Sequence, residues 1–394
     1  MTHRFVSRWS LTALIVLAAL TLTACGGQAP ATAWYGLTPG DEVVYLSATT
    51  KAYAINLPDG TQKWPYEHKV QQASLFGSGM ATDQMHAQPA LGNGLVYFGT
   101  DGGYLVAVDA TSGSEKCSFV PEAPSTFIPF IKEKPAPVYA GPALAGDRVI
   151  FAGTLNNVYA LKATGCESNW KPDWQVDVGS RVWGTPLVVS NTVYVSTLGH
   201  KLIALDVETG QLRWVFDKPM GALAGSPVYD NGVLYVGSFD NNLYAVDAAS
   251  GAQQWAFDAQ NWIWEGPAVV SGTLYFGDVS GNVYALDAAT QKNLWTVELP
   301  KLQTPGGAVR ATPLYADGVL YVGTDSGVLY ALDAATGKER WPQPFKVPNA
   351  RFLTTPLMKD GLLLVAPVGV PALLYALSPT NAQTQWQFPT PSGK

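Results

Sequence analysis

The hydrophobic pattern of this chain is a repetition of short apolar runs separated by turn-forming polar residues. Each run contains a Tyr-x-Gly triplet, and a group of Asp, Asn, Ser and Gly follows it. The clearest triplets end at Gly99, Gly237, Gly277 and Gly323. Asn, Asp and Gly are the residues that a tight β-hairpin needs at positive φ. No helical period lies between the runs, so the pattern predicts antiparallel strands joined by hairpins.

A second motif closes each repeat. In its clearest copies an alanine and a tryptophan stand ten positions apart and flank an Asp-x-x-Thr-Gly turn, as in Ala204 and Trp214. The same spacing occurs at eight places: Ala54 with Trp64, Ala107 with Cys117, Ala160 with Trp170, Ala204 with Trp214, Ala245 with Trp255, Ala285 with Trp295, Ala331 with Trp341 and Ala376 with Trp386. A proline stands eight residues before the strand tyrosine in most copies, for example Pro227 before Tyr235.

Each repeat therefore predicts four strands. The first (A) carries the proline, the second (B) the Tyr-x-Gly, the third (C) the alanine and the fourth (D) the tryptophan. Four antiparallel strands every 40 to 53 residues are typical of a propeller blade. A solenoid would need distinct polar caps at both ends, and neither end resembles one. We predict an all-β fold, an eight-bladed β-propeller of four-stranded antiparallel blades, over residues 34–394.

The N-terminal segment is typical of an export signal. Arg4 and Arg8 precede an uncharged apolar run from Leu11 to Ala24, which is short for a membrane span. The run ends in Leu22-Thr-Ala-Cys25, which resembles the bacterial lipobox. This resemblance implies a signal peptide over 1–24, a lipid on Cys25 and a flexible tether over 25–33. The alternative is an ordinary secretory signal with a chance cysteine. In either case the expected location is extracytoplasmic, and the lipid implies the periplasmic face of an outer membrane or the outer surface of the cell membrane.

The Ala-x-Asp-x-x-x-Gly-x-x-x-Trp motif resembles the tryptophan-docking repeat of pyrroloquinoline quinone (PQQ) dehydrogenase propellers, which BamB-type lipoproteins also carry. In that family each tryptophan stacks on the glycine peptide of the next blade. The resemblance implies these docks: Trp64 on Gly113, Trp170 on Gly210, Trp214 on Gly251, Trp295 on Gly337 and Trp386 on Gly60. Trp255 would meet Gln291 and Trp341 would meet Ala382, so these two joints are expected to be looser.

The resemblance also brings two cysteines together. Cys117 stands where blade 2 should have its tryptophan, and Cys166 stands where blade 3 should have its docking glycine. The family geometry therefore implies a Cys117–Cys166 disulfide, which suits an oxidising compartment. The alternative is two unrelated buried thiols.

Composition and motifs exclude several functions. The net charge of −6 argues against a nucleic-acid partner, but it leaves room for a basic protein partner. The histidines (His3, His68, His86, His200) lack metal-ligand spacing. No nucleophile elbow and no phosphate-binding glycine loop occurs in the sequence. No metal site is predicted, and the recurring aspartates at B–C turns are explained by turn chemistry.

The connections from strand D to the next strand A should all cross one face of the ring. Residues just before strand A should converge on the channel mouth there: His86, Tyr139, Trp183, Trp264, Glu265, Arg310 and Arg351. This set could hold a small anionic or planar ligand. Alternatively it plugs the channel, with Arg310 and Glu265 forming a salt bridge between blades. Apolar loop residues on the same face are candidates for partner binding, namely Phe76, Met80, Met85, Phe127, Phe130, Met220 and Trp262.

Three functions remain after these exclusions. The resemblance favours a non-enzymatic, lipid-anchored and monomeric propeller that binds envelope proteins, with the barrel-assembly machinery as the expected partner. A PQQ-dependent dehydrogenase would need PQQ, calcium and a catalytic aspartate. Such enzymes are also longer and carry adjacent cysteines, which this chain lacks. The third function is a surface lipoprotein that binds a polysaccharide or an extracellular protein.

Overall fold

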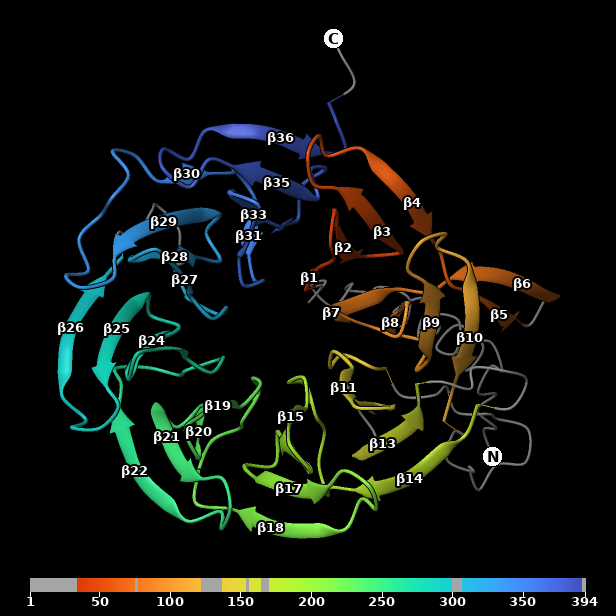
Figure 1. Cartoon of the computed structure of the whole chain (residues 1–394), viewed down its shortest axis with the longest axis horizontal. Coiled ribbons are helices and arrows are strands. Elements are labelled where there is room, and N and C mark those ends of the chain that lie inside the picture. Colours follow the sequence, from red (N-terminus) through yellow and green to blue (C-terminus); the bar gives the residue numbers. More distant parts are fainter. Residues whose placement is uncertain are drawn as a thin grey trace, which may run out of the picture. The chain divides into compact units, whose positions relative to one another are not determined.

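The computed structural model describes residues 34–74, 77–121, 137–153, 156–163, 170–299 and 307–391. From Trp34 onward the chain forms one compact unit, a ring of four-stranded antiparallel sheets (Figure 1). The predicted all-β, eight-bladed propeller is thereby confirmed. Within these described ranges, no helix has the length and apolar character needed to cross a membrane. The signal peptide, Cys25 and the tether lie outside the described residues and stay predictions.

The blades follow one another along the chain. Blade 1 consists of β1 (Gly36–Pro39), β2 (Val43–Ala48), β3 (Lys51–Asn56) and β4 (Gln62–Tyr66), and blade 2 of β7 (Met85–Gly92), β8 (Leu95–Thr100), β9 (Leu105–Asp109) and β10 (Glu115–Phe119). Blade 3 consists of β11 (Ala143–Ala145), β12 (Arg148–Ala152), β13 (Asn157–Lys162) and β14 (Pro172–Asp177), and blade 4 of β15 (Leu187–Val189), β16 (Thr192–Ser196), β17 (Leu202–Asp206) and β18 (Leu212–Phe216). Blade 5 consists of β19 (Val228–Asp230), β20 (Val233–Gly237), β21 (Asn242–Asp247) and β22 (Gln253–Asp258), and blade 6 of β23 (Ala268–Val270), β24 (Thr273–Gly277), β25 (Asn282–Asp287) and β26 (Asn293–Glu298). Blade 7 consists of β27 (Leu314–Ala316), β28 (Val319–Gly323), β29 (Val328–Asp333) and β30 (Phe345–Lys346), and blade 8 of β32 (Leu357–Lys359), β33 (Leu362–Val365), β35 (Leu374–Leu377) and β36 (Thr384–Phe388).

Two further strand pairs lie outside the blades. β5 (Lys69–Ser74) and β6 (Gly77–Thr82) form a hairpin in the connection between blades 1 and 2, and β31 (Arg351–Phe352) pairs with β34 (Pro367–Val368). In the blades themselves the first strand lies near the axis and the fourth lies at the rim (Figure 1). The proline belongs to the first strand only in β7. In blades 3 to 8 it stands directly before that strand, as Pro227 does before β19.

The hydrophobic core is divided among the seams between neighbouring blades. One cluster joins blades 4 and 5 and includes Tyr194, Leu234 and Tyr244, while another joins blades 7 and 8 and includes Tyr321 and Leu363. The two middle strands of each blade, such as β20 and β21, are buried on both faces because each blade packs against two others, whereas outer strands such as β26 are largely exposed. This explains the continuous apolar runs in the sequence.

A tryptophan fills most seams, paired in the sheet with the alanine of its own motif, as Ala204 is with Trp214. Its indole N–H donates to a carbonyl of the next blade, as Trp214 does to Ala248 O at 3.1 Å. The structure places Trp64 on Gly113, Trp214 on Gly251, Trp295 on Gly337 and Trp386 on Gly60. The glycines have φ near +70°, and a Cβ at Gly251 would lie 2.6 Å from the Trp214 ring. Only glycine therefore fits this turn without strain.

Trp170 does not dock on Gly210, contrary to the expectation. Trp174 takes that place: it pairs with Ala160, and its N–H donates to Val207 O at 2.8 Å. The fixed ten-residue spacing fails because the C–D connection of blade 3 is four residues longer. Trp170 instead packs beside Tyr97 in the seam between blades 2 and 3. Trp170 belongs to blade 3, and it packs in the same seam where Cys117 of blade 2 replaces the usual tryptophan.

Cys117 lies in β10 opposite Ala107, the position that other blades give to tryptophan. Cys166 lies outside the described residues. The predicted disulfide between them therefore stays a prediction.

The two joints without glycine differ from each other. Ala382 takes a φ of 61°, and the Trp341 N–H still donates to Pro379 O at 2.8 Å. Gln291 also takes a φ of 61°, but among the described residues the Trp255 indole N–H has no hydrogen-bond acceptor. Both seams were expected to be loose. The seam at Trp341 keeps its indole hydrogen bond, whereas the seam at Trp255 lacks one to the described residues.

Candidate functional site

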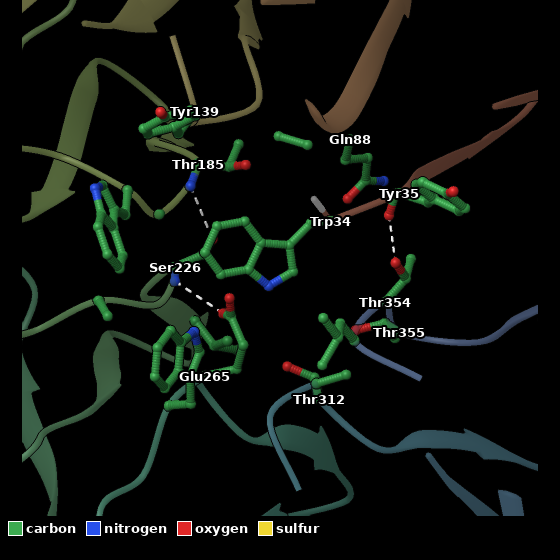
Figure 2. Close-up of a pocket in the computed structure, with 18 residues that line it drawn as sticks. Trp34, Tyr35, Gln88, Tyr139, Thr185, Ser226, Glu265, Thr312, Thr354 and Thr355 are labelled. Carbon is green, nitrogen blue, oxygen red and sulfur yellow. Dashed lines mark hydrogen bonds between the residues drawn. The ribbon is translucent and has the colours of Figure 1, made fainter. Parts of the chain in front are cut away.

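A cavity of about 240 Å³ opens at the mouth of the central channel (Figure 2). It is lined by residues that directly precede the first strands of the blades. The residues that line it include Trp34, Tyr35, Gln88, Tyr139, Trp183, Thr185, Ser226, Trp264, Glu265, Thr312, Thr354 and Thr355. A site assembled from nearly every blade is possible because all eight first strands converge on the axis.

Close approach of the first strands depends on missing side chains. A Cβ on Gly184 would lie 2.5 Å from the Gly225 carbonyl, and one on Gly225 would lie 2.4 Å from Trp264 O. These glycines let neighbouring backbones meet where the ring is narrowest. Hydroxyl groups then join the blades, because Ser226 Oγ accepts the Thr185 N–H at 3.0 Å and Thr312 Oγ1 donates to Gly266 O at 2.8 Å.

Three indole rings meet at the cavity. The centroid of Trp34 lies 5.9 Å from that of Trp183 and 6.3 Å from that of Trp264, and the last two are 6.4 Å apart. The tilted and edge-on ring orientations are those that aromatic quadrupoles favour. Trp34 therefore lies in the middle of the channel mouth (Figure 2), and Trp183 and Trp264 line the cavity beside it.

Glu265 is the one carboxylate in the cavity wall. Burial raises the pKa of Glu265 to about 7, although the backbone N–H groups of Ser226 and Gly266 donate to its carboxylate and oppose this rise. The Ser226 N–H lies 3.0 Å from Oε2 (Figure 2). The side chain therefore changes its charge near neutral pH.

Arg310 does not form the salt bridge with Glu265 that the sequence allowed. Its Nε lies 3.3 Å from Asp325 Oδ2, and its guanidinium carbon lies 4.6 Å from the Trp264 ring centroid. Asp325 belongs to the same blade and follows β28, so the nearer carboxylate takes the arginine. Arg310 thus covers Trp264 as a cation–π partner and leaves Glu265 without a cationic neighbour among the described ion pairs.

Besides Arg310, two further predicted members of the site do not line the cavity. His86 is buried, its Nε2 lies 2.9 Å from Asp101 Oδ1, and its ring meets Tyr139 edge-on. Arg351 lies in β31, which pairs with β34. Arg351 stands five residues before its proline whereas Trp183 and Trp264 stand three before theirs, so Leu353 takes the equivalent place in the wall. Tyr139, Trp183, Trp264 and Glu265 do come together there.

The sequence did not identify Trp34, because blade 1 has no proline eight residues before its strand tyrosine, Tyr45. In the sheet register Trp34 is nevertheless equivalent to Trp183, because each stands four residues before the first-strand residue that pairs with the strand tyrosine, Thr38 or Leu187. Aligning the blades by strand rather than by proline would have found it.

An exposed apolar strip runs outward from the channel mouth over blade 5. It consists of Met220, Phe239 and Trp262, and we call it the rim strip. Met220 is 82% exposed and Trp262 is 47% exposed. Phe239 stacks on Trp262 at 5.0 Å and contacts Trp264 at 4.9 Å, so the strip is continuous with the channel aromatics.

The other loop residues named from the sequence fall elsewhere. Met80 is also exposed, on β6, but Met85 is fully buried because β7 begins there and packs against blade 1. Phe76, Phe127 and Phe130 lie outside the described residues.

Comparison with known sequences gives a family match along most of the chain. The family model described as outer membrane protein assembly factor BamB matches residues 23–125, 131–255, 220–303 and 279–394. One curated relative, an outer membrane protein assembly factor BamB from Moranella endobia (strain PCIT), is 29% identical over 127 residues. That match covers 32% of this chain and 31% of the relative, so it spans about a third of each.

Solved structures share the fold at low sequence identity. BamB from Moraxella catarrhalis superposes with a TM-score of 0.65 at 17% identity, over 84% of this chain and 92% of that chain. A quinohemoprotein alcohol dehydrogenase from Comamonas testosteroni gives 0.64 at 16% identity, over 88% and 72%. The computationally designed protein Ika8 gives 0.65 at 14% identity, over 89% and 96%. These likenesses establish the propeller and nothing about activity.

Proposed function

The chain belongs to the family of the outer membrane protein assembly factor BamB, and we propose that it is a non-enzymatic, lipid-anchored scaffold that binds protein partners at the cell envelope. The barrel-assembly machinery is the first partner to test, because that is the role in the family's description. The rim strip is the observation that carries this proposal. Met220 and Trp262 of this strip are exposed on a rigid propeller, and no described part of the chain covers them.

The rim strip has the chemistry of a protein-binding surface. Its aromatic rings are preorganised by stacking, since Phe239 and Trp262 are nearly parallel at 10°. The backbone beneath them is held by hydrogen bonds from Phe239 N to Ala222 O and from Val279 N to Trp262 O, both 3.0 Å. Stacked aromatic side chains on a fixed backbone have few rotatable bonds to immobilise on binding, and aromatic and methionine side chains are both enriched at protein interfaces.

The test is affinity capture from the source organism's solubilised envelope with the full chain as bait. We expect the unaltered chain to recover a barrel-assembly subunit, and the double substitution Met220→Ala with Trp262→Ala to reduce recovery at least tenfold. Leu294→Ala is the matched control, because Leu294 is 48% exposed but lies on the outer strand β26. Equal capture by the double variant, or capture of no envelope protein by the unaltered chain, would refute the proposal.

The lipid anchor is tested separately on Cys25. If the lipobox is used, the chain takes up labelled fatty acid and fractionates with membranes, whereas Cys25→Ser does neither. Release of both forms into the soluble fraction would contradict the anchor while leaving partner binding open.

The structural likeness to quinohemoprotein alcohol dehydrogenases raises an enzyme as the second candidate. The channel residues do not fit PQQ with calcium. Trp34 stands in the channel centre against Trp183 and Trp264, where a planar cofactor would need a slot. Among the described residues no group of three His, Cys, Asp or Glu side chains could hold a metal ion, and Glu265 is the lone acid in the wall. We expect the chain mixed with PQQ and calcium to show no bound-cofactor absorbance and no dye-linked alcohol oxidation.

A further inference from the structure

We propose that the channel-mouth cavity binds an organic cation, an alkylammonium group held against Trp34, Trp183 and Trp264 and neutralised by Glu265. This goes beyond partner docking, because no residue of the rim strip lines the cavity. The shared chemistry is a protonated or quaternary amine, whether it arrives as a free solute or as a lysine side chain of a polypeptide.

The aromatic wall is the first reason. Three indoles from three blades line one cavity, and tryptophan is the side chain whose ring face attracts cations most strongly. Arg310 already occupies such a position, with its guanidinium carbon 4.6 Å from the Trp264 centroid. Arg310 does not serve as the cavity's own cation, since Asp325 pairs with it and neither residue belongs to the lining.

The second reason is the charge of the wall. The titratable side chains that line the cavity are Tyr35, Tyr139 and Glu265. Burial raises the pKa of both tyrosines above the usual value near 10, so both stay neutral. Around this wall the ionisable groups are Arg310 with Asp325, His86 with Asp101 behind Tyr139, and the exposed Arg181 near Tyr139. An ionised Glu265 is therefore the one unneutralised charge facing the cavity.

The third reason is the sign of the wall's charge together with the size of the cavity. Three hydroxyls of the wall already join the blades: Ser226 Oγ accepts from Thr185 N, Thr312 Oγ1 donates to Gly266 O, and Thr354 Oγ1 donates to Tyr35 O. An anion would be repelled by Glu265. A volume of about 240 Å³ suits a trimethylammonium head or the end of a butylammonium chain.

Binding should be linked to the ionisation of Glu265. Because burial raises its pKa to about 7, most Glu265 side chains are protonated at pH 6 and nearly all are ionised at pH 8.5. A cation binds the ionised form, so affinity is expected to increase about tenfold between these pH values.

The experiment is calorimetric titration of the full chain with tetramethylammonium and with n-butylammonium, with sodium chloride at equal ionic strength as the blank. We expect saturable binding at pH 8.5 that weakens about tenfold at pH 6. Glu265→Gln should weaken binding at pH 8.5 to the pH 6 level and abolish the pH dependence. Glu42→Gln, an exposed acid away from the channel, should behave like the unaltered chain.

Trp183→Phe keeps an aromatic wall and should weaken binding mildly, whereas Trp183→Leu should weaken it strongly. Circular dichroism verifies that each variant is folded.

A short peptide with one lysine distinguishes the two sources of the cation. Tighter binding than n-butylammonium indicates a polypeptide ligand, and equal binding indicates a free solute. The proposal is overturned if neither ammonium ion binds at pH 8.5, if Glu265→Gln binds as well as the unaltered chain, or if glucose alone saturates the site. Because Met220 and Trp262 are untouched, failure here leaves the partner-capture result standing.

Discussion

Glu265 shows how a single side chain responds to the narrow centre of the ring. Its carboxylate accepts hydrogen bonds from the backbone N–H groups of Ser226, at 3.0 Å, and Gly266, and it forms no salt bridge within the described part of the chain. A charge in such surroundings loses hydration that two backbone donors do not restore. The raised pKa is the result, and it makes the stability of the protein depend on pH.

The folded-state pKa of Glu265 lies above the ordinary value of 4.5, so protons favour the folded state. The stabilising effect is complete below pH 4.5 and is lost as the pH rises through about 7. The free energy of unfolding should fall by up to ~3 kcal/mol over that interval, at about 1.4 kcal/mol per pKa unit. In Glu265→Gln this decrease should vanish. Urea denaturation of both proteins at pH 5 and pH 8.5 measures the difference, and parallel pH dependence in the two would contradict it.

Cys117 illustrates a residue whose role depends on a residue outside the described ranges. If it pairs with Cys166, proteolysis without reductant should yield one linked peptide holding both cysteines. A disulfide that closes the loop between Cys117 and Cys166 should stabilise the fold by about 2–4 kcal/mol. Cys117→Ser and Cys166→Ser should therefore each lower the unfolding midpoint. Two free thiols in the non-reduced digest would reject the pair.

At the scale of the blade, the apolar pattern and the turn residues were enough to predict the eight four-stranded sheets, because each blade is built from local hairpins, but not the strand pairs β5–β6 and β31–β34. The same regularity failed at blade 3. Trp170 and Trp174 are both buried tryptophans near the expected spacing, and only the length of the connection decides which one pairs with Ala160. Loop length is not encoded in a periodic pattern.

The site was less predictable for a related reason. Tyr139, Trp183, Trp264 and Glu265 were found because a proline marks the start of each first strand nearby. Trp34 has no such mark. The partners of Arg310 and His86 depend on which carboxylate is closest in space, and a one-dimensional spacing does not carry that distance.

The seams permit a matched comparison between two docking tryptophans. Trp214→Phe removes an indole N–H bond of 3.1 Å to Ala248 O and part of the buried ring. Trp255→Phe removes a similar ring area but no such bond to the described residues. We expect the first substitution to destabilise the protein by about 1 kcal/mol more than the second, the usual worth of one hydrogen bond. Denaturant midpoints of the two variants test this, and equal midpoints would show that the bond adds nothing to the seam.

At the scale of the whole propeller, the ring closes through one further seam. The strands of blades 1 and 8 each come from one continuous stretch of chain, and Trp386 joins them by donating to Leu57 O at 2.9 Å and packing on Gly60. Tyr35 O also accepts from Thr354 near the axis. Closure therefore uses the same contacts as the interior seams.

Trp386→Ala should open this closure preferentially. Loss of a docked indole leaves a cavity, for which a cost of about 3–5 kcal/mol is typical. Hydrogen exchange should speed up first in blades 1 and 8, because they are held at one side only once the seam is lost. Trp255→Ala is the control, and it should raise exchange in blades 5 and 6 instead. Uniform acceleration around the ring in both variants would indicate that the propeller opens as a single unit.

The self-contained blades have a consequence for the gene as well as for the protein. Since no strand is exchanged between the first blade and the last, the seam at Trp386 is equivalent in kind to the one at Trp64. A circularly permuted chain that starts at another blade, with the original ends joined by a linker, would encode the same set of seams. The order of the blades thus has a starting point in the gene but none in the fold.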